Sequence, residues 1–181
     1  MKTNSGLLLI LVCCAMAVSA RAADVITTKV STDHGVQLYR WPKLSPPPGW
    51  HQDMAQSAAQ GVNALAPDGS TFDKADTVIY ARAIYIPSQT RIRDLKQVIQ
   101  EDRDAFRKSD PAVGISQLDT LESRAGLDFQ TYSFASPAQP DWEAVAYGED
   151  QDYFFLFVIS SRTEAGYRAN LGAFQDLVRS Y

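Results

Sequence analysis

Two stretches of the chain place apolar residues at helical spacing. In the first, charged residues separate the apolar ones, Asp110-Pro111 ends the pattern, and the apolar positions are Ile92, Leu95, Val98, Ile99 and Phe106. The second follows Thr163, a residue type that caps helices, and its stripe is Tyr167, Leu171, Phe174, Leu177, Val178 and Tyr181. The spacing predicts two amphipathic helices that each pack one face on a core.

Six other stretches are rich in β-branched and aromatic residues and are bounded by turn residues. They predict strands at about 36–41, 61–66, 77–86, 127–134, 142–147 and 153–160, after an extended lead-in at 24–30. The stretches 77–86 and 153–159 are apolar on both faces, so we expect them to be covered on both faces, and 153–159 to be the central strand. Residues 148–152 have the composition of a hairpin loop.

The strands follow one another in hairpin order, and each predicted helix lies between or after them. This order favours an α+β fold, in which an antiparallel β-sheet is flanked by helices as an α/β/α sandwich. We expect residues 24–181 to form one such domain.

The first 23 residues have the pattern of a secretory signal peptide. Lys2 supplies positive charge, 7–18 is an apolar run too short for the roughly 20 residues of a membrane span, and Ala22 and Ala23 offer a cleavage site. We therefore expect a periplasmic protein with no stable membrane span after processing. Cys13 and Cys14 both lie inside this run, without the small preceding residue that lipoprotein processing requires.

Charge and cysteine content exclude several chemistries for the exported part. The chain has a net charge of −4, and loss of Lys2 and Arg21 makes it more negative, which argues against nucleic-acid binding. The exported part contains no cysteine and no phosphate-binding glycine loop, so we expect no disulfide and no cofactor. The acidic residues of 149–152 lack the pattern of a calcium loop, and we interpret them as a solvated hairpin tip.

Several motifs resemble the PsbP/Mog/DcrB superfamily over roughly residues 38–181. They are the Pro-Gly-Trp at 48–50, the strands around 78–83, 142–147 and 157–162, the helix containing 102–106, and the closing helix that ends in Tyr181. The resemblance implies an α/β/α sandwich that acts in binding or assembly and not as an enzyme. The superfamily includes a photosystem extrinsic subunit, a Ran-binding protein and bacterial envelope proteins.

Tyr39, Trp41 and Trp50 flank the proline-rich loop and are the candidate binding residues. Aromatic side chains beside rigid prolines can form a recognition groove, although they can equally fill one end of the sheet. His51 and Asp53 are the candidate pair for a rival function, a small periplasmic hydrolase.

Arg82 and Glu143 each interrupt an apolar strand and so need a partner if they are buried. We predict an ion pair between them across the sheet, the alternative being that each reaches solvent. Together the patterns predict a non-catalytic periplasmic binding or assembly protein whose partner is an envelope protein or a small ligand. The alternatives are the hydrolase and an immunity-type inhibitor of an envelope-targeted toxin.

Overall fold

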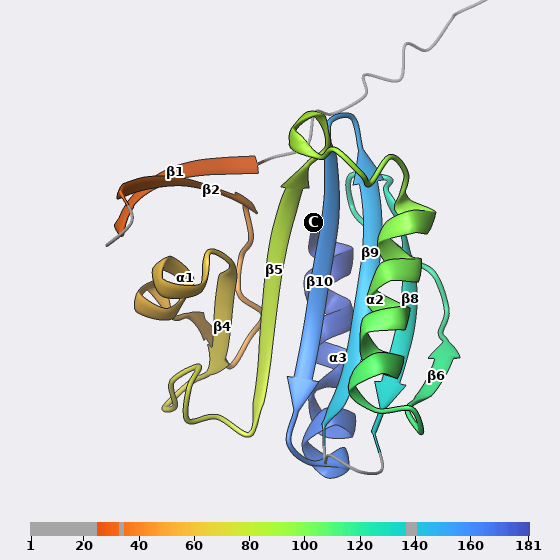
Figure 1. Ribbon diagram of the computed structural model, residues 1–181. Coiled ribbons are helices and arrows are strands. Elements are labelled where there is room, and N and C mark those ends of the chain that lie inside the picture. Colours follow the sequence, from red (N-terminus) through yellow and green to blue (C-terminus); the bar gives the residue numbers. More distant parts are fainter. Residues whose placement is uncertain (1–24, 33–34, 137–140) are drawn as a thin grey trace, which may run out of the picture.

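An eight-stranded antiparallel sheet forms the centre of the protein in a computed structural model that describes residues 25–32, 35–136 and 141–181 (Figure 1). The strand order is β3-β4-β5-β10-β9-β8-β6, and β7 pairs with β8 beside this path. These strands are β3 (Trp50–Gln52), β4 (Asn63–Pro67), β5 (Thr77–Tyr85), β6 (Gly114–Gln117), β7 (Leu121–Glu122), β8 (Asp128–Ala135), β9 (Trp142–Asp150) and β10 (Tyr153–Ser161). The predicted α+β class, an antiparallel sheet flanked by helices, is confirmed.

Strand β10 is the central strand, as its two apolar faces predict. It pairs with β5 on one side and β9 on the other, so that Phe157 lies between Ala81 and Ala146. The predicted loop at 148–152 is wrong in length, because β9 continues to Asp150 and a tight turn at Gln151 (φ 50°) leads into β10. Residues 148–150 have the composition of a loop, but they pair with Tyr153, Phe154 and Phe155 of β10. These cross-strand pairs stabilise the extended hairpin.

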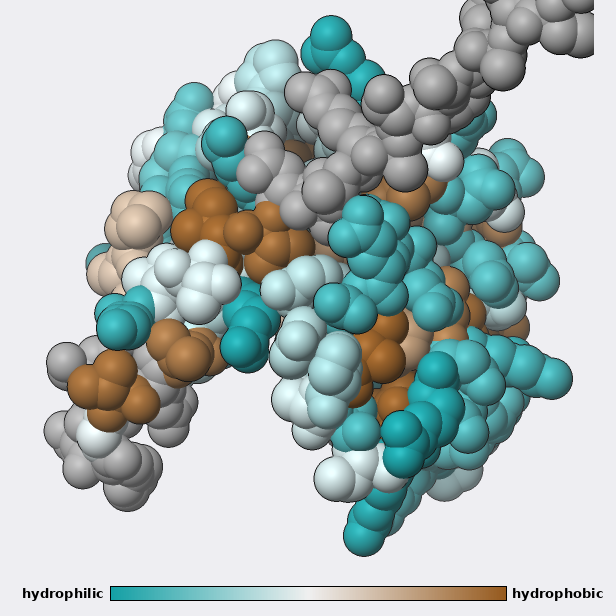
Figure 2. Space-filling model, turned by 90° about the horizontal axis from the view of Figure 1, so that it is seen from above, coloured by the Kyte–Doolittle hydropathy of each residue, from teal (hydrophilic) through white to brown (hydrophobic). Residues whose placement is uncertain are grey.

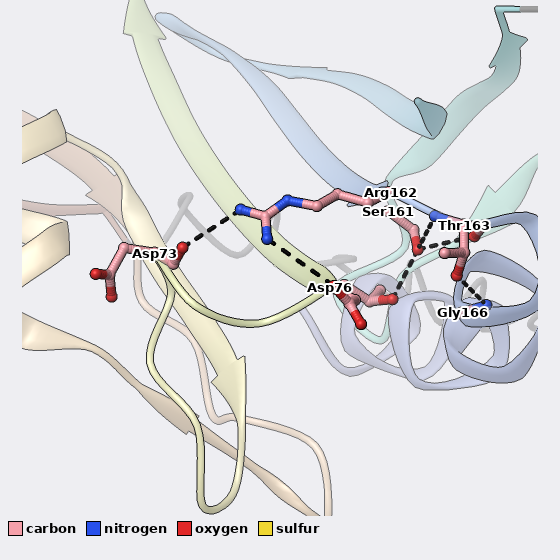
Figure 3. Close-up of polar contacts among 7 residues, drawn as sticks. Asp73, Asp76, Ser161, Arg162, Thr163 and Gly166 are labelled. Atoms are coloured by element: carbon pink, nitrogen blue, oxygen red, sulfur yellow. Dashed lines mark hydrogen bonds and ion pairs between the residues drawn. The ribbon is translucent and has the colours of Figure 1, made fainter. Parts of the chain in front are cut away.

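Helices α2 (Leu95–Ser109) and α3 (Glu164–Ser180) cover opposite faces of this sheet (Figure 1). Both begin at predictable caps, since the side chain of Asp94 accepts a hydrogen bond from Gln97 N and that of Thr163 accepts one from Gly166 N. Figure 3 shows the start of α3, where the Ser161 hydroxyl at the end of β10 donates to the Thr163 carbonyl at 2.9 Å. Ser161 Oγ also lies 2.8 Å from the Thr77 hydroxyl on β5, which ties this end of the helix to the sheet.

Each helix buries a separate apolar cluster. The α3-side cluster contains Phe129, Phe155, Phe157, Phe174 and Leu177. The α2-side cluster contains Val98, Ile99, Val145, Phe154, Leu156 and Val158. Burial of such side chains is the main favourable term in folding, at about 25 cal/mol per Å² of apolar surface.

A two-stranded hairpin, β1 (Val25–Thr32) and β2 (Gly35–Pro42), projects from the main body (Figures 1 and 2). Its base is fixed by Asn63, whose side-chain amide donates to the carbonyl of Pro42, and by the Arg40 guanidinium, which lies 4.8 Å from the centre of the Tyr85 ring. The hairpin carries apolar surface, which Figure 2 shows in brown.

The structure corrects three expectations from the sequence. Strand β5 is not covered on both faces, because α2 lies over β8 and β9 in Figure 1, so one face of β5 stays partly exposed. Helix α1 (Met54–Gln60) and the short strands β3, β6 and β7 were not predicted, and the extended lead-in at 24–30 forms the paired strand β1. The strand predicted at 61–66 begins at Asn63, because Gly61 (φ 68°) ends α1 in the left-handed conformation that glycine adopts readily.

The short helix η1 (Ile86–Ser88) follows β5 and leads towards α2. Within the described ranges, no helix has both the length and the apolar composition that crossing a membrane requires. Residues 1–24, which include the predicted cleavage site at Ala22 and Ala23, lie outside the described residues.

Candidate functional site

The three aromatic residues around the proline loop lie in two places: Tyr39 and Trp41 belong to the hairpin strand β2, whereas Trp50 lies on β3 in the α3-side cluster. Trp41 is 4% exposed and Trp50 8% exposed, and the Tyr39 and Trp41 rings stack with their centres 6.3 Å apart. The ring of Tyr39 also approaches Gly61 so closely that a Cβ at this position would lie 2.3 Å from it. Trp41 and Trp50 therefore present little surface to a ligand, and their positions are those of packing residues.

His51 and Asp53 occupy adjoining positions, but their contacts serve other purposes. The two carboxylate oxygens of Asp53 accept hydrogen bonds from the backbone N–H groups of Gln56 and Phe72, which cap α1 and fix the following loop. These bonds hold the pKa of Asp53 below its ordinary value. His51 Nδ1 lies 3.3 Å from a carboxylate oxygen of Asp68, which belongs to the turn after β4. Within the described residues, the acidic contact of the imidazole is therefore with Asp68 and not with Asp53.

The structure does not bring Arg82 and Glu143 together. The strand register places Arg82 opposite Leu156, whereas Glu143 lies opposite Ser160, four residues further along β10 and on its other side. Strand spacing of about 4.8 Å and a rise of about 3.3 Å per residue put their Cα atoms about 16 Å apart. Arg82 is exposed, and among the described residues no ion pair joins it to Glu143. The predicted pairing is corrected because sequence alternation fixes the face of a residue but not its register.

A pocket of about 280 Å³ opens where the C-terminal end of α2 meets strands β8 and β9. Its apolar lining includes Phe106 and Phe134, whose rings stack with centres 4.0 Å apart, and Val113. The helical stripe that places Phe106 on the sheet side of α2, and the alternation that places Phe134 on the same face of β8, were both readable in the sequence. The sequence did not show that these two rings meet in the wall of a cavity.

The polar lining of this pocket is acidic. It contains Asp110, Asp141 and Glu143, together with Ser109 and Ser136. Asp110 ends α2 and is 8% exposed; one of its oxygens accepts from Ala112 N at 2.8 Å and the other from the Ser136 hydroxyl. Its carboxylate is therefore held rigidly at the pocket wall.

Glu143 is the most unusual of the three acids, because it reaches the pocket from a strand whose next five residues are buried. Burial raises its pKa, a hydrogen bond with Ser160 lowers it, and the neighbouring charges of Asp141 and Asp102 raise it further. Perturbed acids in a cavity are typical of functional sites. The sequence singled out Glu143 as a residue that needs a partner but assigned the wrong one.

A second buried carboxylate lies beside the pocket under α2. Asp102 Oδ2 accepts a hydrogen bond of 3.0 Å from the Tyr147 hydroxyl on β9. Burial raises the pKa of Asp102, while this hydrogen bond and the Arg82 charge lower it. Burial also raises the pKa of the Tyr147 hydroxyl, as does the charge of Asp102, so Tyr147 remains a hydrogen-bond donor at neutral pH.

The described part of the chain holds no group of three or more His, Cys, Asp or Glu side chains placed to bind a metal ion. In the acidic stretch at 149–152, Glu149 and Asp150 belong to the end of β9 and Asp152 to the following turn. The pocket at the end of α2 is therefore the strongest candidate site on these residues.

Comparison with known proteins finds no family model and no curated protein that matches the chain. Several solved structures are similar to it, among them the following two. The solution structure of cyanobacterial PsbP from Synechocystis sp. PCC 6803 has a TM-score of 0.45 and 12% identity, over 90% of this chain and 94% of that chain. A Pseudomonas aeruginosa protein of unknown function, described as a putative regulator, has a TM-score of 0.42 and 8% identity, over 86% of this chain and 95% of that chain. Membership of the superfamily stays a prediction from the sequence motifs.

Proposed function

We propose that this chain is a non-catalytic binding or assembly protein of the cell envelope, and that the pocket at the end of α2 receives part of its partner or ligand. The observation that carries the proposal is the cavity of about 280 Å³, whose lining combines apolar side chains with three acidic residues. A concave apolar site with a few fixed polar groups is the usual form of a ligand-binding site.

The envelope location is supported by the pattern of residues 1–23. A basic start, a short apolar run and small residues at Ala22 and Ala23 are what an export signal requires. The partner that we propose is accordingly an envelope protein or a small molecule of that compartment.

Export is tested by the intact mass of the protein recovered from the periplasm of its own host. The proposal expects a mature N-terminus at Ala23 or Asp24, or within a few residues of them. A chain that retains Met1 in the cytoplasm, or that carries acyl groups on Cys13 or Cys14, would contradict the envelope assignment.

The pocket is tested by filling it. Ala105 lines the cavity from an exposed position on α2, so Ala105→Trp should block the pocket while the protein still folds. Ala169→Trp is the matched control, since Ala169 is exposed on α3 across the sheet. Affinity capture from envelope extract should recover a partner with the wild type and the control but not with Ala105→Trp. Equal capture by all three would show that binding occurs elsewhere.

A further inference from the structure

We propose that the group bound in this pocket is an organic cation, an ammonium or guanidinium carried on a short apolar stem. This inference rests on the proposed binding function and adds the chemical class of the ligand. Its basis is the pairing of an acidic wall with an aromatic one in a cavity the size of a single side chain.

The charge of the lining is unbalanced. Asp110, Asp141 and Glu143 contribute carboxylates, and none of the lining residues among those described is basic. The stretch 137–140, which joins Ser136 to Asp141 in the sequence, also contains no basic residue. A bound cation would relieve the mutual repulsion of these carboxylates, and the partial burial of Glu143 makes that attraction stronger than at an open surface.

The end of α2 adds to the negative potential. Ser109 is the last residue of the helix and Asp110 its cap, and both line the pocket. The C-terminus of a helix carries a partial negative charge from its unpaired carbonyl groups, which favours a cation there. This contribution is independent of the acidic side chains.

The basic residues of α2 are directed elsewhere. Arg107 lies 3.4 Å from the exposed carboxylate of Asp104, and Lys108 is exposed outside the pocket lining. The Arg103 guanidinium lies over the Tyr132 ring, 5.5 Å from its centre. Neither residue of that contact belongs to the pocket lining.

The apolar wall and the small volume distinguish an organic cation from a metal ion. Phe106, Phe134 and Val113 would contact a hydrocarbon stem, which a hydrated metal ion lacks. Aromatic rings also attract cations through their electron-rich faces. A cavity of about 280 Å³ lies at the lower end of ligand-site volumes, roughly 300–1,000 Å³, and so suits one side-chain-sized group.

The test titrates the exported protein with small probes, followed by the NMR shifts of its backbone amides. The probes are N-acetyl-arginine amide, N-acetyl-norleucine amide, which keeps the stem without the charge, and N-acetyl-glutamate amide. We expect the arginine probe to shift the amides of Phe106, Ser109 and Val113 and to bind about tenfold more tightly than the norleucine probe, the effect of one charged hydrogen bond. Free butylguanidinium in a parallel titration distinguishes the sources: tighter binding of the amide probe indicates a side chain within a peptide, and equal binding indicates a free organic cation.

Variants of the acids test the site itself. Glu143→Gln keeps the shape of the side chain and should weaken the arginine probe about tenfold. Asp141→Asn should weaken binding of the arginine probe a few-fold. Because Asp141 is exposed, this second variant still tests the site if Glu143→Gln fails to fold. Glu149→Gln is the control, since Glu149 is exposed on the same strand outside the pocket lining.

Three results would overturn the cation class. They are equal binding of the norleucine probe, no response of the pocket amides to any cationic probe, and calcium chloride reproducing the same shifts with tighter binding. In each case the proposed function would still be supported if the wild type captures a partner and Ala105→Trp does not. If Ala105→Trp leaves both capture and probe binding unchanged, the pocket is not the site and both proposals fail.

Discussion

At the scale of residues, two partly buried carboxylates lie between α2 and the sheet, Asp102 on α2 and Glu143 on β9. Burial raises the pKa of both Asp102 and Glu143. Opposing contributions come from the Tyr147 hydroxyl and the Arg82 charge at Asp102, while the Asp141 charge adds to the shift at Glu143. A buried acid with a raised pKa binds its proton more tightly in the folded than in the unfolded state.

The first prediction concerns pH and stability. Because the folded protein binds these protons more tightly, the free energy of unfolding should fall as pH rises above about 4, through the raised pKa values of the two acids. Asp102→Asn removes one ionisable group and keeps an acceptor for Tyr147, so its decline should be smaller. Urea denaturation at about pH 4, 5, 6 and 7 measures both slopes.

The exposed Glu101 on the same helix provides the control for this experiment, as Glu101→Gln should leave the wild-type slope unchanged. Asp53 acts with the opposite sign, because its lowered pKa costs stability only as pH falls below about 3.8, outside the measured range. A variant Asp102→Asn with the same pH slope as the wild type would contradict the burial of this carboxylate in solution.

At the scale of elements, close packing decides where each strand and helix tolerates change. Gly148 lies in β9 against Phe129, and a Cβ there would lie 2.6 Å from the Phe129 ring. Phe129 is 0% exposed, so the ring has no free volume to move into. Gly172 lies within α3, and a Cβ there would meet nothing within 4 Å.

The second prediction compares these two glycines. Gly148→Ala should destabilise the protein by about 1–3 kcal/mol, the usual cost of overpacking a filled core. Gly172→Ala should stabilise it by about 0.5–1 kcal/mol, because alanine loses less backbone freedom than glycine in a helix. Chemical denaturation of both variants measures the difference, and equal effects would show that strand β9 and Phe129 do not pack as described.

The elements themselves differ in how well their sequence predicts them. Helix α2 and helix α3 have apolar stripes of several turns, which no strand pattern imitates, so both were found. The cap Thr163 of α3 and the end of α2 at Asp110 were predicted, whereas the cap Asp94 of α2 was not. Helix α1 has seven residues, Met-Ala-Gln-Ser-Ala-Ala-Gln, with no apolar stripe to detect. Its two signals, the cap Asp53 and the terminal Gly61, were present in the sequence but are common in loops as well.

At the scale of the whole molecule, a few buried side chains join the projecting hairpin to the sheet. Trp41 comes from β2 in the hairpin, and Trp50 comes from β3 at the edge of the sheet and belongs to the α3-side cluster. Asn63 on β4 links the two parts, since it donates to the Pro42 carbonyl and accepts from Gln52 at 2.9 Å. Loss of Trp41 should therefore weaken the hairpin itself, and loss of Trp50 should weaken the α3-side cluster at the edge of the sheet.

The third prediction separates this packing role from a binding role. Trp41→Ala and Trp50→Ala should each lower the free energy of unfolding by about 3–5 kcal/mol, as truncations of buried aromatic residues do. Met54→Ala is the control, since Met54 is 62% exposed on α1 and should change stability by less than about 0.5 kcal/mol. Small stability losses combined with lost partner capture would assign these tryptophans to a binding surface after all.

The sequence by itself determined the class of the fold and most of its elements. Hydrophobic patterning is a local property, and the β-branched and aromatic residues of 127–134 and 153–160, bounded by turn residues, favour strands in both stretches. The hairpin order of β8, β9 and β10 then favours an antiparallel sheet, and the two apolar faces of β10 favour a central place in it. The crossing of the chain from β5 to β6 at the far edge of the sheet could not be predicted in this way.

Only the tertiary structure decided the register and the site. Arg82 and Glu143 lie on the face of the sheet where alternation places them, yet the pairing of β5, β10 and β9 separates them by four residues along the strands. The pocket forms where α2 ends above β8 and β9 and where Phe106 meets Phe134. These elements are far apart in the sequence, so local patterns do not show that they meet. Local patterns determine which face a side chain occupies, whereas the packing of whole elements determines which side chains meet.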